Sequence, residues 1–77
     1  MIGYHVTTDN KLSKYNLTGA ILPPVRFWPN IETAERWAKK TGRGRIVSFS
    51  CDKYYPLPDH RPACWTPEII RKYVVVT

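Results

Sequence analysis

Residues 30–42 read NIETAERWAKKTG, a segment with the pattern of an amphipathic helix and with a signal at each end. Asn30 is a good N-cap, because its side-chain oxygen can accept a hydrogen bond from a free backbone N–H of the first turn. Gly42 is a natural stop, because glycine readily adopts the left-handed conformation that ends many helices. One face at helical spacing is formed by Ile31, Ala34, Trp37, Ala38 and Thr41. The sequence therefore predicts the main helix over about residues 30–41.

Strands are predicted on both sides of this helix. In residues 45–51 apolar positions alternate with serines, so one face of that strand is expected to be buried. Residues 2–7 also read as a strand, and a short strand over residues 25–28 ends at Pro29. Residues 73–76 form an unbroken apolar run, which suits a central position in a sheet.

The remaining segments are predicted as short turns and loops. Residues 9–15 have the pattern of a short helical turn with Asp9 as its cap. Residues 52–63 contain three prolines and are expected to form a loop. A threonine, a proline and a glutamate at 66–68 have the pattern of a helix start, which predicts a turn over residues 67–72. The expected fold class is α+β, with one main helix packed on a small, mostly antiparallel sheet.

Length and composition limit the classes of function. The chain has 77 residues, so residues 1–77 are expected to form one domain without separate cofactor and substrate domains. No apolar run approaches the ~18–20 residues that cross a bilayer, and the first residues lack the pattern of a signal peptide. We therefore expect a cytoplasmic protein with no membrane partner. In that reducing compartment Cys51 and Cys64 are expected to be buried thiols.

Residue types that ligate metals occur in the second half of the chain. They are Cys51, Asp52, Asp59, His60 and Cys64. Their spacing lacks the paired pattern of structural zinc sites, and Cys51 fits the buried face of a strand. The sequence therefore predicts no metal site.

Positive charge is the strongest compositional signal. Lysine and arginine number 12 against 6 aspartates and glutamates, which gives a net charge of +6. Lys39, Lys40, Arg43 and Arg45 cluster at the end of the predicted helix and in the turn after it. Lysines at a helix C-terminus interact favourably with its dipole, but the two arginines lack that structural motive. A positive field favours polyanions or acidic protein patches as partners, and the alternative is an ordinary solvated basic surface.

A second candidate surface lies in the proline-containing loop. Tyr54, Tyr55 and Arg61 are residue types that interfaces favour, and exposed tyrosines can stack on nucleic-acid bases. The alternative is a loop that folds back to cover the small core.

Several segments together resemble a known family. They are Tyr-His-Val-Thr at 4–7, Val-Arg-Phe-Trp at 25–28, Glu-Thr-Ala-Glu-Arg-Trp-Ala at 32–38 and the closing stretch at 65–74. This pattern is similar to the ADP-ribosyltransferase-like fold, which includes mono-ADP-ribosyltransferases and RNA 2'-phosphotransferases. The resemblance spans most of the chain, although the chain is much shorter than members with full NAD-binding loops.

The resemblance implies roles for four residues. His5 matches the first-strand histidine that holds the NAD ribose, and Phe27 or Trp28 stands where the family has a residue near the nicotinamide. Glu68 is the acid nearest to the family's catalytic glutamate, but it falls in the turn after that position. From the residues alone, His5 also fits a strand histidine with a local partner, and Glu68 fits an acid in the first turn of a helix.

Two functions follow from these observations. The first is a small basic interaction module that binds an acidic protein surface or a nucleic acid and inhibits or tethers it, with no cofactor. A compact inhibitor of a host machine, as in phages or other mobile elements, is one such setting. The alternative is a minimal ADP-ribosyltransferase-like enzyme that uses NAD, with His5 and Glu68 as catalytic residues and Phe27 and Trp28 at the cofactor. The last strand could also pair with a second copy if it lies at an edge.

Overall fold

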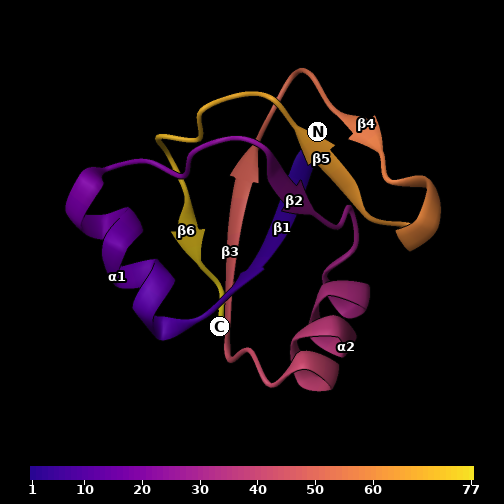
Figure 1. Cartoon of the computed structure of the whole chain (residues 1–77), viewed down its shortest axis with the longest axis horizontal. Coiled ribbons are helices and arrows are strands. Elements are labelled where there is room, and N and C mark those ends of the chain that lie inside the picture. Colours follow the sequence, from indigo (N-terminus) through magenta and orange to yellow (C-terminus); the bar gives the residue numbers. More distant parts are fainter.

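The computed structural model describes all of residues 1–77 and contains two helices and two small antiparallel sheets (Figure 1). The elements are, in chain order, β1 (Ile2–Thr7), α1 (Asp9–Thr18), β2 (Val25–Phe27), α2 (Ile31–Thr41), β3 (Arg45–Ser50), β4 (Tyr55–Pro56), a 3-10 turn η1 (Pro58–His60), β5 (Cys64–Thr66) and β6 (Val74–Val75). The strands are ordered β1-β3-β6 in the first sheet and β2-β5-β4 in the second. The predicted α+β class is confirmed. Neither helix is long and apolar enough to span a membrane.

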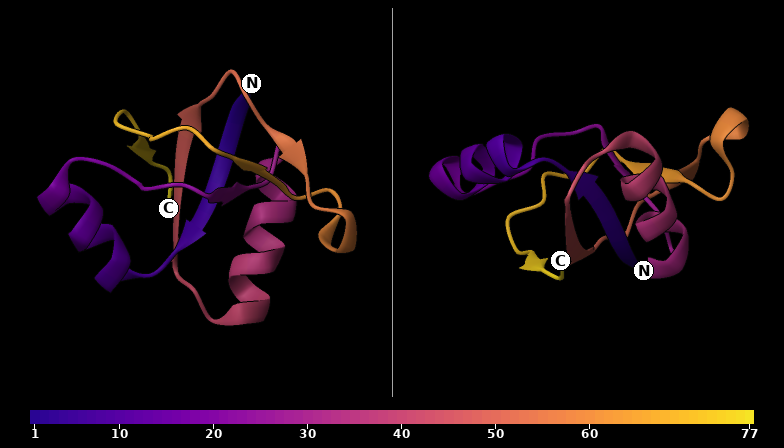
Figure 2. Two further views of the ribbon diagram at one scale, coloured as in Figure 1. Left: turned by 45° about the horizontal axis from the view of Figure 1, so that its top comes forward. Right: turned by 90° about the horizontal axis from the view of Figure 1, so that it is seen from below.

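The first sheet separates two apolar clusters. On one side α2 packs through Ala34 and Ala38 against Val6 and Ile46. On the other side the second sheet crosses the first, as Figure 2 shows, and its buried residues meet those of β3. That second cluster consists of Leu12, Ile21, Val25, Phe27, Val47, Phe49, Cys51 and Ile70. The two sheets are therefore held together by side chains and by one backbone bridge between Tyr4 and Trp28.

A glycine allows the two sheets to come this close. A Cβ atom built on Gly3 would lie 2.5 Å from Cδ2 of Phe27, which is well inside van der Waals contact. Phe27 has no exposed surface. The strand β1 therefore needs a residue without a side chain where the ring of Phe27 crosses it.

The main helix has the predicted ends. Oδ1 of Asn30 accepts a 2.8 Å hydrogen bond from the backbone N–H of Glu32, as an N-cap does. Gly42 has φ of 71°, and its N–H donates to the carbonyls of Ala38 and Lys39. The prediction of a helix over about residues 30–41 is therefore confirmed, because its start and its end are both encoded locally.

The first helix is longer than the short turn predicted over residues 9–15. It extends to Thr18 and ends at Gly19, whose φ is 78°. Its cap is Thr8 rather than Asp9, because Oγ1 of Thr8 accepts a hydrogen bond from the backbone N–H of Lys11. Asp9 lies in the first turn, where the helix dipole favours a negative charge.

The predicted helical turn over residues 67–72 is wrong. Ile70 instead pairs with Ile21 through two backbone hydrogen bonds of 2.8 and 3.0 Å, which keep the chain extended. The hydroxyl of Thr66 accepts from the N–H of Glu68 but also donates to the carbonyl of Lys53, and Thr66 itself belongs to β5. A long-range pairing therefore overrides a local helix-start pattern.

The last strand is also placed differently from the prediction. It lies at the edge of the first sheet, and only two of its residues pair with β3. Val74 is 69% exposed and Val75 is 41% exposed. The apolar run does not mark a central strand, because β1 already occupies the other side of β3 along its whole length.

Candidate functional site

A row of three side chains crosses the outer face of the second sheet. Arg26 of β2 lies opposite Trp65 of β5, and Trp65 lies opposite Tyr55 of β4. Partners in register share a face of a sheet, and neighbours along each strand point to the other face. That other face carries the buried residues Val25, Phe27 and Thr66. We call the outward set, Arg26, Trp65 and Tyr55, the Arg-Trp-Tyr row.

The row combines a paired aromatic surface with a free cation. The rings of Tyr55 and Trp65 have centroids 5.1 Å apart and planes tilted by 34°. Tyr55 is 48% exposed, and Arg26 is exposed. Arg26 takes part in no ion pair, because the structure contains a single one, between Arg45 and Asp9. The row can therefore offer a flat apolar surface and a positive charge to the same ligand.

An open cavity of about 610 Å³ adjoins the row. Its lining consists of Pro23, Pro24, Arg26, Leu57, Trp65 and Pro67. Prolines fix the backbone that carries them, so these walls lose little conformational entropy when a ligand binds. The volume lies within the range of small-molecule pockets.

The two tyrosines predicted as one surface have different roles. Tyr54 is 41% exposed, but its ring also packs edge-to-face with Phe27, with centroids 6.2 Å apart, so it partly covers the core. Tyr55 faces outward in the row. Arg61 is exposed and lies after η1. Tyr54 therefore fits the reading of a loop that covers the core, and Tyr55 and Arg61 stay predicted contact residues.

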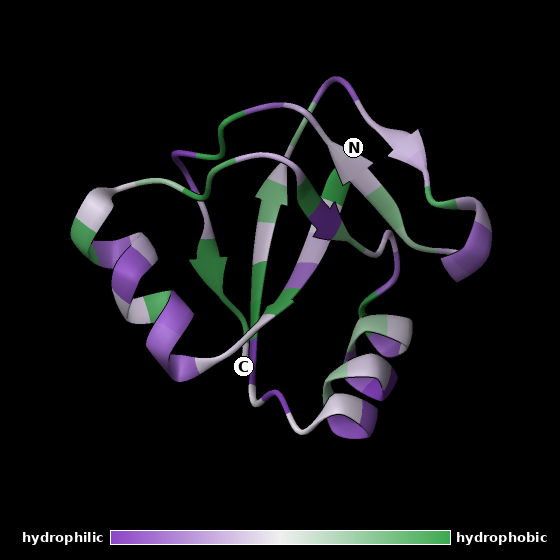
Figure 3. Cartoon of the chain, viewed as in Figure 1, coloured by the Kyte–Doolittle hydropathy of each residue, from purple (hydrophilic) through white to green (hydrophobic).

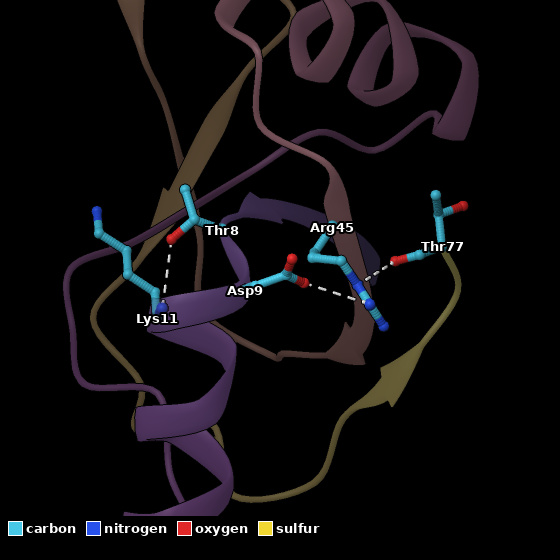
Figure 4. Close-up of polar contacts among 5 residues, drawn as sticks. All are labelled: Thr8, Asp9, Lys11, Arg45 and Thr77. Carbon is cyan, nitrogen blue, oxygen red and sulfur yellow. Dashed lines mark hydrogen bonds and ion pairs between the residues drawn. The ribbon is translucent and has the colours of Figure 1, made fainter.

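The predicted basic cluster is divided in a similar way. Nε of Arg45 donates to the carbonyl of Thr77, and its Nη1 lies 3.3 Å from Oδ1 of Asp9 (Figure 4). Arg45 thereby connects β3 to the start of α1 and to the segment after β6. Lys40 and Arg43 are exposed, and Nζ of Lys40 lies 5.8 Å from the centroid of the Trp37 ring.

His5 is held by two protein groups. Its Nδ1 lies 2.6 Å from the carbonyl oxygen of Arg26, and its Nε2 lies 3.2 Å from the hydroxyl of Tyr15. A neutral imidazole satisfies both contacts if Nδ1–H donates to the carbonyl and the hydroxyl donates to Nε2. Burial lowers the pKa of His5; the hydrogen bond to Arg26 opposes this, and the charges of Lys11, Arg43 and Arg26 add to the lowering. His5 therefore anchors the strand that carries Arg26.

Glu68 is also engaged by the protein. Its carboxylate accepts hydrogen bonds from the backbone N–H groups of Asp52 and Lys53, at 2.6 and 2.5 Å. It thereby orders the turn that leads from β3 toward β4. Neither expected role, in the first turn of a helix or at a catalytic centre, describes these contacts.

The four residues of the NAD-dependent alternative are not assembled in one cavity. Phe27 and Trp28 are buried in different apolar clusters. Glu68 lines a second cavity, of about 910 Å³, and His5 lines neither this cavity nor the first. Neither of these two cavities is therefore lined by both His5 and Glu68.

Both cysteines are free thiols. Cys51 is buried, as predicted, and Cys64 is only partly buried. Burial raises the pKa of each thiol, so both are protonated at neutral pH.

Sequence reasoning missed Arg26 and Trp65 as site residues. Arg26 stands between two buried apolar residues of β2, which is a signal for an outward position. Trp65 carries no comparable signal, because β5 has only three residues and lies in a segment rich in prolines. The row exists only through the pairing of three strands, of which β2 is far from β4 and β5 in sequence.

Comparisons of this chain with protein-family models, curated protein sequences and solved structures find no match. The resemblance to the ADP-ribosyltransferase-like fold therefore stays a prediction, and function has to be argued from the geometry of the site.

Proposed function

We propose that this protein is a small basic interaction module that binds single-stranded nucleic acid on the Arg-Trp-Tyr row. The observation that carries the proposal is the in-register placement of Arg26, Trp65 and Tyr55 on one open sheet face. Bases stack on exposed aromatic rings, and each such contact is worth about 1–3 kcal/mol. The guanidinium of Arg26 lies at the end of the row, where it can pair with a phosphate.

The distribution of charge supports a polyanionic ligand. The net charge is +6, and Lys11 and Arg43 come close enough to His5, together with Arg26, for their charges to lower its pKa. The charges of Lys11, Arg43 and Arg26, which come from three separate segments, therefore act together at His5, whose Nδ1 contacts the carbonyl of Arg26. Such a field attracts a phosphate backbone and makes its binding salt-dependent.

An acidic protein surface is the other partner predicted for a basic module. Tryptophan, tyrosine and arginine are also the commonest residues at protein–protein hot spots. We favour nucleic acid because the row places two paired aromatic rings and an unpaired arginine beside a cavity, which suits stacking of a base and pairing with its phosphate. The NAD-dependent alternative draws no support from this arrangement, since its residues line no common cavity. Tethering or blocking a bound strand, in the cytoplasm, belongs to the same proposal.

The test is fluorescence anisotropy with a labelled twelve-residue oligothymidylate and its RNA counterpart at several salt concentrations. We expect Trp65→Ala to weaken binding about 5- to 150-fold, which is the loss of one stacked base. Arg26→Ala should also weaken binding, because it removes the positive charge at the end of the row. Its matched control is Arg36→Ala on the exposed side of α2, which removes one positive charge outside the row. Thermal melting followed by circular dichroism verifies that each variant is folded.

Two results would overturn this proposal. One is an affinity that Trp65→Ala leaves unchanged in a folded variant. The other is that polyglutamate, at equal charge concentration, displaces the oligonucleotide and that Trp65→Ala weakens the binding of polyglutamate equally. This result would assign the row to acidic proteins.

A further inference from the structure

The edge of the first sheet beside β6 is incompletely covered. Strand β3 has six residues, but β6 pairs with only Val47 and Ser48. No strand pairs with the outer side of β6. Figure 3 shows that β6 is strongly hydrophobic, although it lies at the edge of the sheet. An exposed apolar edge of this kind is a template for another strand.

The hydrogen bonds show which backbone groups face this open side. The backbone N–H of Cys51 donates to the carbonyl of Met1, on the side of β3 that faces β1. The backbone N–H of Ile46 donates to the carbonyl of Thr77, and the carbonyl of Ile46 accepts from the N–H of Val76, both on the side that faces β6. Because these directions alternate along an antiparallel strand, Ser50 also faces the β6 side, beyond the last pair with β6. By the same alternation, Val75 directs its N–H and carbonyl away from β3. The free edge at Ser50 belongs to β3, and the free edge at Val75 belongs to the outer side of β6, one strand further out. The outer side of β6 is the edge on which a further strand can be added.

A groove follows this edge. It has a volume of about 910 Å³ and is lined by Ile2, Asn16, Gly19, residues 48–50 and residues 68–74. We call it the β6 groove. Its exposed apolar side chains include Ile2 at 52%, Ile69 at 48% and Val74 at 69% exposure. The β6 groove shares no lining residue with the cavity beside the Arg-Trp-Tyr row.

The charges of the groove select its occupant. Arg71 and Lys72 are exposed lining residues and form no ion pair. Glu68, the only acid in the lining, is already bound by the N–H groups of Asp52 and Lys53. A second copy of this chain would bring like charges together across the interface, whereas an acidic segment would complement them.

We infer that the β6 groove binds an extended acidic peptide segment of a partner protein by addition of a strand to the sheet edge. Its backbone pairs with the outward edge of β6 at Val75, its apolar side chains pack on Val74, and its acidic side chains meet Arg71 and Lys72. Because side chains of a strand alternate, the preferred segment alternates acidic with β-branched residues. This surface is separate from the proposed nucleic-acid site, so the protein could connect a bound strand to a partner protein.

The test uses two labelled eight-residue peptides, one that alternates valine with glutamate and one that alternates valine with lysine. We expect the glutamate peptide to bind at least tenfold more tightly by fluorescence anisotropy. In ¹H–¹⁵N spectra, the amide of Val75 should shift and exchange more slowly with solvent when it is bound. Arg71→Glu with Lys72→Glu should weaken this binding at least tenfold, whereas Arg36→Glu with Lys39→Glu, the matched double charge reversal on α2, should not.

A substitution in β6 separates strand addition from charge attraction. Val75→Pro removes an outward N–H without removing a hydrogen bond to β3, so it should abolish peptide binding and leave the sheet intact. Val75→Thr retains the N–H and should bind normally. The Trp65→Ala variant should bind the peptide normally, because Trp65 does not line the β6 groove. Peptide binding therefore tests the groove independently of whether the row binds nucleic acid.

Several outcomes would overturn the inference. They are equal binding of the two peptides, no change at the amide of Val75, and competition by oligothymidylate for the β6 groove, which would assign the groove to phosphates. A dimer in sedimentation equilibrium that Val75→Pro dissociates would assign the edge to a second copy. If Val75→Pro does not fold, the double charge reversal and the amide shifts decide the question.

Discussion

The two sheets of this protein differ in how many of their faces are buried. The first sheet buries Val6 and Ile46 beneath α2 and buries Val47 and Phe49 beneath the second sheet. The second sheet buries one face and leaves the Arg-Trp-Tyr row on the other. A small domain has little apolar surface to bury, so an uncovered aromatic pair beside an unpaired arginine is not what stability alone favours. The proposed nucleic-acid site lies on this uncovered face of the second sheet, whereas both faces of the first sheet contribute to the core.

The largest expected effect comes from the buried face of the second sheet. Phe27→Ala removes a fully buried ring that meets Phe49 edge-on, with centroids 5.4 Å apart. Such a truncation costs about 3–5 kcal/mol, which approaches the whole stability of a small domain. We expect a largely unfolded chain or a much lower midpoint in urea denaturation followed by circular dichroism.

The exposed face supplies the control. Tyr55→Ala removes a half-exposed ring and its contact with Trp65, so it should cost only about 0.5–1.5 kcal/mol. If Phe27→Ala and Tyr55→Ala destabilised the protein equally, the distinction between a buried and a functional face of this sheet would be wrong.

The next effect tests how closely the two sheets approach each other. Gly3→Ala places a Cβ atom against the ring of Phe27, and overpacking of this kind costs about 1–3 kcal/mol. Gly44→Ala is the matched control, because a Cβ atom there would meet no atom within 4 Å. We expect the melting temperature to fall for Gly3→Ala and not for Gly44→Ala. A similar melting temperature for both variants would contradict the observed packing of β1 against Phe27.

The smallest effect concerns pH. Burial lowers the pKa of His5 in the folded protein, so between about pH 6.5 and that lower pKa the unfolded chain binds more protons than the folded one. The stability that the neutral imidazole contributes is therefore present above about pH 6.5 and is lost as the pH falls. His5→Asn, which retains a donor for the carbonyl of Arg26, should reduce this loss in urea denaturation measured at pH 7.5 and pH 5.5.

One result would contradict this assignment for His5. A parent protein that gains stability as the pH falls through this interval would show that His5 is not held as a neutral imidazole.

Local signals account for the parts of the fold that the sequence predicts correctly. The main helix follows from Asn30, Gly42 and a consistent apolar face, and β3 follows from strict alternation. These patterns depend on neighbours within one or two turns, so they can be recognised without knowledge of the partners. The strand order and the place of β6 depend on pairing across the chain, and an apolar run looks the same at an edge as at the centre.

The candidate site could be predicted only in part for the same reason. Tyr55 was identified by composition, but its neighbours in the row come from β2 and β5, which are joined by register alone. Arg43 and Arg45 looked equivalent in the sequence, yet Arg45 is committed to Asp9 and Thr77. A charged side chain is available to a ligand only if no ion pair or hydrogen bond within the protein engages it. For Arg45 the engaging residues, Asp9 and Thr77, lie far away in the chain.

The indole N–H resonances in ¹H–¹⁵N spectra test the central claim most directly, because the protein has three tryptophans and only one lies in the row. Trp28 and Trp37 pack against each other beside α2, with ring centroids 5.6 Å apart, and serve as internal controls. When oligothymidylate is added, the resonance of Trp65, assigned by its loss in Trp65→Phe, should shift while the other two stay in place. Saturable binding that leaves the Trp65 resonance unchanged would contradict the assignment of the Arg-Trp-Tyr row as the nucleic-acid site.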